Sequence, residues 1–313
     1  MDLYADAFEK VWSALPTLKD ECVARARPAA SSPAGPGKED KEESVAEGSI
    51  RGFTSFDIDI VVKFGGSLTR DLELCRRLIR NIVGLSNAGR RIIVVPGDGR
   101  TDKVVKAIDR EQSLAADTTH RACALAQDQT GLLLADPSFS DGLVACKTLA
   151  SCRSALDRGK AAVLLPSRLL FDLDPIEKTF DVTSDAVAAW LAWLVAAQRL
   201  VVLTDVDGVF AGGNLGSKAH LIRQVPAVRL STMGHTAIDA CAAAFLEARQ
   251  MDCTILNGNF PDRLTAWAEG GSVVGTVVLG RCGATSELYD LSRRRRAGPA
   301  LADQSARLSG KTP

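Results

Sequence analysis

The chain has 313 residues, of which 46% are hydrophobic and 24% charged, a composition typical of a folded protein with enough apolar side chains for a core. Lysine plus arginine equals aspartate plus glutamate at 38 each, so the charge balance favours neither nucleic acid nor an anionic membrane as a partner. We therefore expect small-molecule partners, no nucleic acid and no membrane. The first residues lack a signal-peptide pattern, and no stretch approaches the roughly 20 apolar residues of a membrane span, which predicts a cytoplasmic protein.

Four regions follow one another along the chain. Residues 1–26 place apolar residues three and four apart, which predicts an amphipathic helix. Residues 27–56 are rich in Pro, Gly, Ser and charges, as in a flexible linker. Residues 57–280 should form the folded domain, and residues 281–313 an Arg-rich, disordered tail.

Short apolar runs alternate with helical patterns in the central domain. Strands are predicted at 58–64, 91–97, 161–167, 199–205, 253–258 and 272–280, and helices at 71–89, 102–112, 120–135, 183–197 and 236–251. Nearly continuous apolar strands are typical of a sheet covered on both faces. We therefore predict an α/β fold, a three-layer α/β/α sandwich with a mainly parallel sheet and ligands at the carboxyl ends of its strands.

The eight cysteines include no CxxC pair, and the chain has only three histidines. A structural zinc site is therefore not expected. Most of the cysteines lie in or beside apolar segments, where free thiols behave as small buried hydrophobes. We predict that they are reduced and mostly structural.

The first strand ends in Lys63, Phe64, Gly65, Gly66 and Ser67. Glycines at a strand-to-helix turn allow close approach of the backbone to a phosphate, and the following helix terminus would offer free N–H groups. The lysine would add a positive charge beside them. An ordinary chain reversal explains the Gly-Gly-Ser turn equally well.

A second strand ends in Pro96, Gly97, Asp98, Gly99 and Arg100, again before a helix. Two glycine-bearing turns after two strands of one sheet favour a shared phosphate or substrate site. The alternative is a pair of ordinary turns, with helix caps at Asp98 and Thr101.

Two further elements carry carboxylates. Thr183, Ser184 and Asp185 open a helix, where the aspartate could cap the helix, hold lysines at a transferring phosphoryl group, or do both. Beyond the next strand comes a Gly-rich loop that starts with Thr204, Asp205, Val206, Asp207 and Gly208 and extends to Lys218. Because the spacing and terminal glutamate of a calcium loop are missing, a nucleotide-binding turn is favoured.

Several enzyme classes are excluded by missing motifs. The sequence has no GxxxxGK[ST] segment and no HRD or DFG motif, so it is neither a P-loop NTPase nor a protein kinase. It also lacks a GxSxG elbow, which argues against serine-hydrolase chemistry.

Taken in order, these elements resemble the amino acid kinase family from about residue 58 to 280: a strand-end Lys-x-Gly-Gly-Ser, a Pro-Gly-Gly-Gly-like loop, a Ser-Asp before a helix, and Thr-Asp-Val-Asp-Gly. Within the family, LLPSRLLF, FDVTSDAVAAWLA, LTDVDGVF and LNGNFPDRL are most similar to archaeal-type [5-(aminomethyl)furan-3-yl]methyl phosphate kinases of methanofuran biosynthesis. Uridylate and acetylglutamate kinases look more distant.

The resemblance implies ATP-dependent transfer to the phosphate of an aminomethylfuran for a methanofuran-like C1 carrier, with Mg²⁺ held mainly through the phosphates, and a homo-oligomer. The resemblance implies catalytic roles for Lys63 and Asp185, phosphate contacts for Gly65, Gly66 and Ser67, and nucleotide contacts for Thr204, Asp205, Val206, Asp207, Gly208 and Lys218. From the residues themselves we add Gly97 and Gly99 as phosphate contacts, and Asp98, His120, Thr183 and Ser184 as acceptor contacts. Asn257 could close the site, although an ordinary Asn-Gly turn explains it equally. A surface or capping histidine is as good an explanation of His120.

Two positions depart from the family pattern. Asp98 replaces a middle glycine, and its carboxylate would repel phosphate unless it turns away or meets an amine or magnesium. We hypothesise that it faces a cationic part of the acceptor, such as an aminomethyl group; unchanged acceptor affinity in Asp98→Gly would contradict this. The segment from Ser231 to Thr236 also lacks the second lysine of acetylglutamate kinases, whose role either passes to Lys218 or is absent.

Three alternatives remain open. The departures would fit a non-catalytic member of the same fold that binds ATP or anions. The terminal segments would fit an adaptor that docks partners. A kinase acting on a nucleoside monophosphate or isopentenyl phosphate would fit the same motifs.

Overall fold

The structure is a computed structural model that describes residues 57–175, 183–211, 220–230, 232–233 and 236–281. The predicted N-terminal helix and linker lie outside the described residues, as does the predicted tail beyond Arg281. Lys218 also lies outside them.

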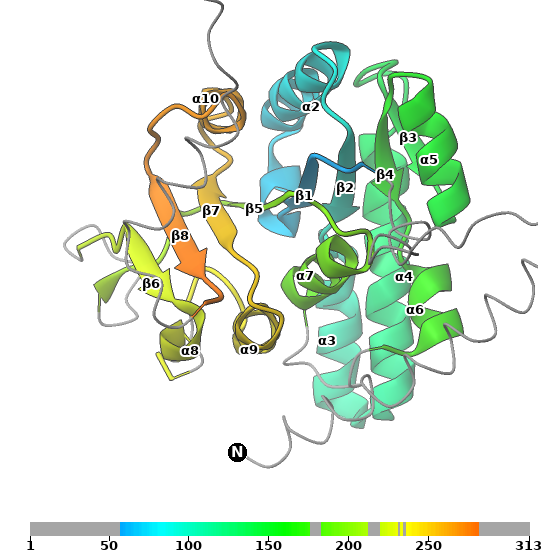
Figure 1. The fold of residues 1–313 in the computed structure, drawn as a ribbon. Helices are drawn as coiled ribbons and strands as arrows, with labels where there is room; N and C mark the ends of the chain where they lie inside the picture. The colour runs from blue at the N-terminus through cyan, green and yellow to red at the C-terminus, as the bar shows by residue number, and fades with distance from the viewer. Residues whose placement is uncertain (1–56, 176–182, 212–219, 231, 234–235, 282–313) are drawn as a thin grey trace, which may run out of the picture.

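A single sheet of eight strands runs through the described domain in the order β3-β4-β2-β1-β5-β7-β8-β6 (Figure 1). The strands are β1 (Ile60–Phe64), β2 (Ile92–Pro96), β3 (Leu143–Cys146), β4 (Ala161–Leu164), β5 (Arg199–Thr204), β6 (Gln224–Pro226), β7 (Cys253–Asn257) and β8 (Gly275–Leu279). Neighbouring strands are parallel apart from the antiparallel pair β7 and β8.

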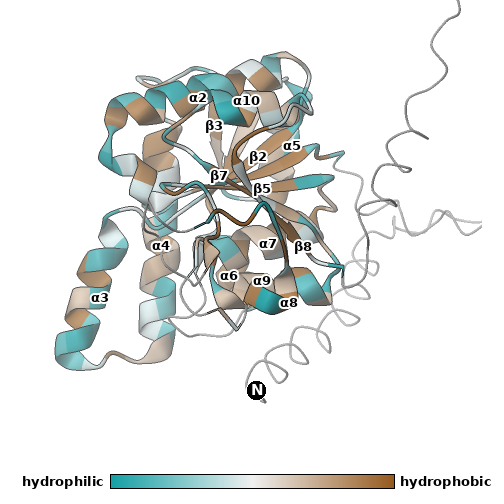
Figure 2. Cartoon of the chain, turned by 90° about the vertical axis from the view of Figure 1, so that its left-hand side faces the viewer, coloured by the Kyte–Doolittle hydropathy of each residue, from teal (hydrophilic) through white to brown (hydrophobic). Residues whose placement is uncertain are grey.

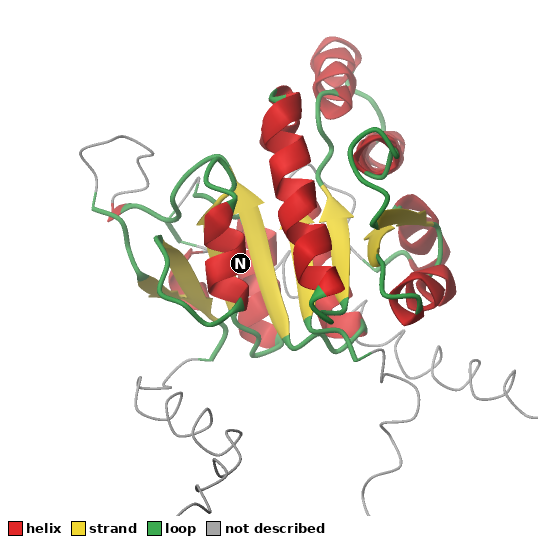
Figure 3. Ribbon diagram, turned by 90° about the horizontal axis from the view of Figure 1, so that it is seen from above, coloured by secondary structure: helices red, strands yellow, loops and turns green. Residues whose placement is uncertain are grey.

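Helices lie on both sides of the strands when the domain is viewed from above (Figure 3). They are the 3₁₀ helix η2 (Gly66–Arg70) and the α-helices α2 (Leu72–Asn87), α3 (Thr101–Gln112), α4 (Ala116–Leu134), α5 (Leu149–Asp157), α6 (Ser167–Leu173), α7 (Ser184–Leu194), α8 (Ala227–Leu230), α9 (Ala240–Ala248) and α10 (Asp262–Ala268). The predicted three-layer α/β/α architecture is confirmed. None of the helices in the described ranges is both long and apolar enough to cross a bilayer.

The two faces of the sheet bury separate cores because strand side chains alternate between faces. Ile60, Val62 and Phe64 of β1 pack into the core that contains α2 and α10. Val61 packs into the opposite core with α7 and α9. Lys63, two residues beyond Val61, therefore belongs to the face covered by α7.

Some elements differ from the sequence prediction. We did not predict β3, α5 or α6, because a four-residue strand and helices of nine and seven residues are too short for a clear apolar period. The last strand is shorter than predicted and runs antiparallel to β7. The start of α5 is fixed locally by a capping box between Thr148 and Ser151, a signal that the apolar pattern does not carry.

The chain changes direction across the sheet at β1. It proceeds from β1 to β2 on one side, and later returns to place β5 on the other side of β1. In open α/β sheets, ligands bind beyond the carboxyl ends of the strands at such a switch point. The carboxyl ends of β1, β2 and β5 are therefore where the predicted site residues should meet.

Candidate active site

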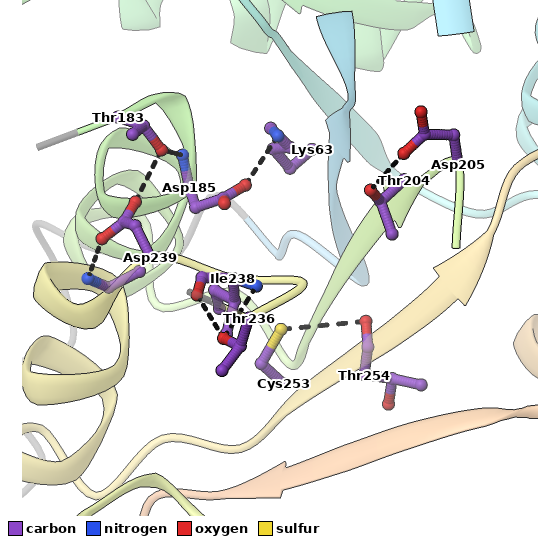
Figure 4. Close-up of polar contacts among 11 residues, drawn as sticks. Lys63, Thr183, Asp185, Thr204, Asp205, Thr236, Ile238, Asp239, Cys253 and Thr254 are labelled. Atoms are coloured by element: carbon purple, nitrogen blue, oxygen red, sulfur yellow. Dashed lines mark hydrogen bonds and ion pairs between the residues drawn. The ribbon is translucent and has the colours of Figure 1, made fainter. Parts of the chain in front are cut away.

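Lys63 and Asp185 form a close ion pair, with 2.6 Å between Lys63 Nζ and Asp185 Oδ1 (Figure 4). Lys63 lies in β1 one residue before its end, and Asp185 lies in the first turn of α7. Each side chain is only 10% exposed, so the pair is largely screened from water. The sequence left open whether Asp185 caps its helix or holds a lysine; it holds the lysine.

Negative charge around Lys63 keeps it protonated. Although burial acts to lower the pKa of Lys63, its ion pair with Asp185 and the nearby charges of Asp98 and Asp239 raise it above its ordinary value. A lysine in this environment is a fixed positive charge and not a base. It is suited to stabilising negative charge that develops beside it.

Thr183, and not Asp185, caps α7. Thr183 Oγ1 accepts a hydrogen bond from Asp185 N at 3.2 Å and donates one to Asp239 Oδ2 at 2.6 Å. Asp239 Oδ1 in turn accepts from Ala242 N at 2.6 Å and so caps α9. Burial and the charge of Asp185 raise the pKa of Asp239 to about 6. The starts of α7 and α9 are thereby linked by a hydrogen bond beside the ion pair (Figure 4).

The two glycine-bearing turns lie against each other. A Cβ atom on Gly66 would come within 2.6 Å of Gly99 N, and one on Gly97 within 2.5 Å of Gly66 N. A Cβ atom on Gly65 would meet Leu203 O of β5 at 2.5 Å. These glycines therefore allow the ends of β1, β2 and β5 to approach closely, which brings the two turns into contact.

The turn after β1 does not lead directly into an α-helix. It continues as η2, in which Ser67 is half-buried, and α2 begins only at Leu72. The N-terminus of α2 is capped by the Asp71 carboxylate, which accepts from Glu73 N and Leu74 N. The expectation that a helix terminus directly after Ser67 offers its free N–H groups is therefore wrong for α2.

A pocket of about 300 Å³ opens beside the ion pair, between α3, α4, α6 and α7. Asp98, His120 and Thr183, three of the four residues assigned to the acceptor from the sequence, line it, whereas Ser184 is buried at the start of α7 and does not. Figure 2 shows α3 and the adjoining part of α4 extending away from the sheet on this side. Asp98 does not cap α3, since the residue at the cap is Arg100, without a side-chain cap bond.

The loop after β5 contacts β7, β8 and α10. Asp207 Oδ1 accepts hydrogen bonds from Arg263 Nη1 at 2.5 Å and from Asn257 Nδ2 at 3.0 Å. Although partial burial acts to raise the pKa of Asp207, these two partners lower it. Gly208 has a φ of +143° and packs against Thr276. Asp207 and Gly208 thus shape the loop.

The other described residues at the start of this loop are at least partly exposed. Asp205 is exposed, and Thr204 and Val206 are half-buried. Thr204 Oγ1 lies 3.4 Å from Asp205 Oδ1. In the described ranges, no group of three or more His, Cys, Asp or Glu side chains is arranged to hold a metal ion.

Comparison with known proteins identifies the family. The family model described as "Amino acid kinase family" matches residues 60–257. The chain belongs to the amino acid kinase family. The resemblance seen in the motifs is thereby confirmed, and the chain is a phosphotransferase. The match extends from β1 to the end of β7 and so includes both Lys63 and Asp185.

Two curated members of the amino acid kinase family cover most of the described domain. The [5-(aminomethyl)furan-3-yl]methyl phosphate kinase of Methanocaldococcus jannaschii is 27% identical over 220 residues, covering 70% of this chain and 97% of the relative. The uridylate kinase of Natronomonas pharaonis is 32% identical over 240 residues, covering 70% of this chain and 98% of the relative.

Solved structures show the same fold. The crystal structure of uridylate kinase from Archaeoglobus fulgidus has a TM-score of 0.57 at 20% identity and covers 71% of this chain and 100% of its own. The UMP kinase structure from Ureaplasma parvum has a TM-score of 0.55 at 16% identity, covering 71% of this chain and 99% of its own.

Sequence reasoning missed Asp239, Gln127 and Lys106. Asp239 has a local signal, since an aspartate directly before an Ala-rich run is a typical helix cap. Gln127 and Lys106 line the pocket from α4 and α3. Nothing in the local sequence distinguishes either one from a solvent-facing helix residue.

Proposed function

We propose that this kinase transfers the γ-phosphoryl group of ATP to the phosphate of a small acceptor, [5-(aminomethyl)furan-3-yl]methyl phosphate, in the biosynthesis of a methanofuran-type C1 carrier. An acceptor phosphate oxygen forms the new P–O bond, the bond between the γ-phosphorus and the β,γ-bridging oxygen breaks, and ADP and a diphosphate ester leave. The observation that carries this proposal is the enclosed Lys63–Asp185 pair at the switch point of the sheet.

Each part of the site has a role in this reaction. Lys63 neutralises charge on the transferring group, and Asp185 fixes the position of its ammonium. Gly65, Gly66, Ser67, Gly97 and Gly99 present backbone near the phosphates. The loop from Thr204 to Gly208 contacts the nucleotide from the end of β5. Mg²⁺ held through the phosphates would supply further charge neutralisation.

The relative and the pocket together support this choice of acceptor. The Methanocaldococcus jannaschii kinase aligns over 97% of its length, so its acceptor is a natural first candidate. The uridylate kinase relative, at 32% identity, makes UMP the second. The described lining of the pocket contains no phenylalanine, tyrosine or tryptophan, which argues against a site built to stack a pyrimidine.

The test is ADP release by the purified full chain with Mg-ATP, comparing the furan phosphate with UMP, isopentenyl phosphate and acetylglutamate. Turnover on the furan phosphate, lost in Lys63→Met, supports the proposal. Lys160→Met is the matched control, because Lys160 precedes β4 at the opposite end of the sheet and its Nζ donates to Asp141 O at 3.2 Å, away from the site. ATP binding without turnover on any acceptor would favour the non-catalytic alternative. Turnover on UMP alone would mean that UMP is the acceptor in place of the furan phosphate.

A cytoplasmic location and assembly into a homo-oligomer stay predictions from the sequence and the family. The proposed reaction requires neither a partner protein nor a membrane. Size measurement of the full chain in solution would test the oligomer directly.

A further inference from the structure

Two enclosed oxygen atoms of the acceptor pocket have no hydrogen-bond donor among the described residues. They are Asp98 Oδ1 and Gln127 Oε1, and both residues line the pocket. Gln127 is buried in α4, with 4% of its surface exposed. Enclosing an acceptor without a donor costs about 1–3 kcal/mol, so a ligand that brings donors into the pocket would recover this energy.

The packing of the second glycine turn against α4 places these two residues near each other. A Cβ atom on Gly99 would meet Thr130 Oγ1 at 2.6 Å, so the turn that contains Asp98 touches α4 at Thr130. Gln127 precedes Thr130 by three residues, and residues at this spacing lie on the same face of a helix. The same turn and the same helix face therefore present both oxygens to one pocket.

The charges of the described pocket lining favour a cation. Asp98 and Asp109 contribute carboxylates. Lys106 contributes an ammonium, but its Nζ is 2.9 Å from Asp102 Oδ2 and is already paired. A phosphate would meet net negative charge here. The phosphate of the acceptor is better placed near the glycine turns and Lys63. The pocket is then left for another part of the acceptor.

We infer that Asp98 and Gln127 bind the ammonium group of the acceptor, so that the kinase selects phosphate acceptors carrying a primary amine. The inference rests on the proposed function, because it places the acceptor in this pocket. An ammonium has three N–H donors and no acceptor, which suits two enclosed oxygens without donors. It also gives a reason for an aspartate where the family pattern has glycine: the carboxylate selects the amine end and does not face the phosphate.

The experiment uses probes that differ only in the amine. [5-(Aminomethyl)furan-3-yl]methyl phosphate and its 5-methyl analogue are compared by equilibrium binding to the full chain without ATP, and by turnover with Mg-ATP. The variants are Asp98→Asn and Gln127→Leu. Asp109→Asn is the control, because Asp109 lines the same pocket but its Oδ1 already accepts from Leu114 N at 3.0 Å.

The wild-type chain should prefer the amine probe by on the order of 10- to 100-fold in Kd. Asp98→Asn should abolish most of this preference, Gln127→Leu should reduce it several-fold, and Asp109→Asn should keep it. Equal binding of the two probes, no measurable binding of the amine probe, or an unchanged preference in Asp98→Asn overturns the inference. So does an Asp98→Asn variant that changes only the Mg²⁺ requirement.

The two proposals can fail separately. Turnover of both probes without an amine preference leaves the kinase reaction standing and removes amine recognition. Amine-selective binding that depends on Asp98, with no turnover of the furan phosphate, supports recognition of the amine and removes the proposed acceptor reaction.

Discussion

Thr183, which caps α7, donates a 2.6 Å hydrogen bond to Asp239, which caps α9. The starts of the two helices are therefore linked by a hydrogen bond beside the Lys63–Asp185 pair (Figure 4). Since Asp185 follows Thr183 by two residues, this hydrogen bond fixes where the Asp185 carboxylate can lie. We interpret Thr183 and Asp239 as positioning residues for the ion pair.

Thr183→Val should separate this positioning role from stability. The valine keeps the shape but loses the cap and the bond to Asp239, so the free energy of unfolding should fall by about 1–2 kcal/mol. Misplacement of Asp185 should also lower kcat by about 10-fold, with little change in KM for ATP. Urea unfolding and steady-state kinetics measure the two effects.

Thr148→Val is the matched control for this prediction. Thr148 caps α5 through a capping box with Ser151, on an element that does not line the pocket. It should lose comparable stability with unchanged kcat. An equal fall in kcat in both variants would mean that stability alone explains the effect of Thr183.

Asp185→Asn should remove most of the activity. The amide retains the size of the carboxylate but no longer balances the charge of Lys63 in a site where each side chain is 10% exposed. We expect kcat to fall by about 100- to 1,000-fold. Asp157→Asn, which breaks the exposed pair with Arg91, should leave kcat unchanged. Near-normal turnover by Asp185→Asn would show that the ion pair has no part in the reaction.

Gly66→Ala should disrupt the contact between the two glycine turns. Its Cβ would lie 2.6 Å from Gly99 N, closer than unstrained atoms approach, so the turns must move apart and both stability and turnover should fall. Gly84→Ala provides the opposite outcome. Gly84 lies in α2 with open space at its Cβ position, so alanine should stabilise the fold by about 0.5–1 kcal/mol. Thermal unfolding of both variants distinguishes backbone crowding from a general intolerance of glycine replacement.

The stability of the ligand-free chain should depend on pH through Asp98. Burial and the charge of Asp102 raise the pKa of Asp98 to about 6 from 3.8. The folded state therefore holds this proton more tightly than the unfolded state, and the contribution of Asp98 to stability falls as pH rises from about 4 to about 6. Asp98→Asn removes that loss, so its stability relative to wild type should increase across this range by on the order of 1–3 kcal/mol.

The same measurement has an internal control of opposite sign. Because the pKa of Asp207 is lowered, Asp207 stabilises the folded state at neutral pH, and its contribution is lost as pH falls. Asp207→Asn should therefore be more destabilising at pH 7.5 than in acid, when both are followed by urea unfolding. A pH-independent difference for Asp98→Asn would contradict the assignment.

The groups that face Asp98 and complicate its titration are Lys63 on β1, Asp102 and Lys106 on α3, His120 and Cys123 on α4, and Asp185 on α7.

Much of the fold was predictable because its signals are local. Continuous apolar runs identified most strands, helical periods identified the long helices, and glycines with a lysine marked the ends of β1 and β2. Alternation of side chains along a buried strand follows from backbone geometry alone. The sequence therefore determined the layered α/β fold, the end of the sheet that carries the site, and the residues Lys63 and Asp185.

Tertiary structure alone decided which of these residues meet and what surrounds them. The Lys63–Asp185 pair joins residues on β1 and α7, and the Thr183–Asp239 bond spans 56 positions. Gln127 becomes a candidate binding residue only because α4 packs against Gly99. Burial sets the pKa of Asp98, and burial depends on every element that covers it. The physical reason is that charge and hydrogen bonding act over a few ångströms in space, whereas sequence patterns report only on neighbours along the chain.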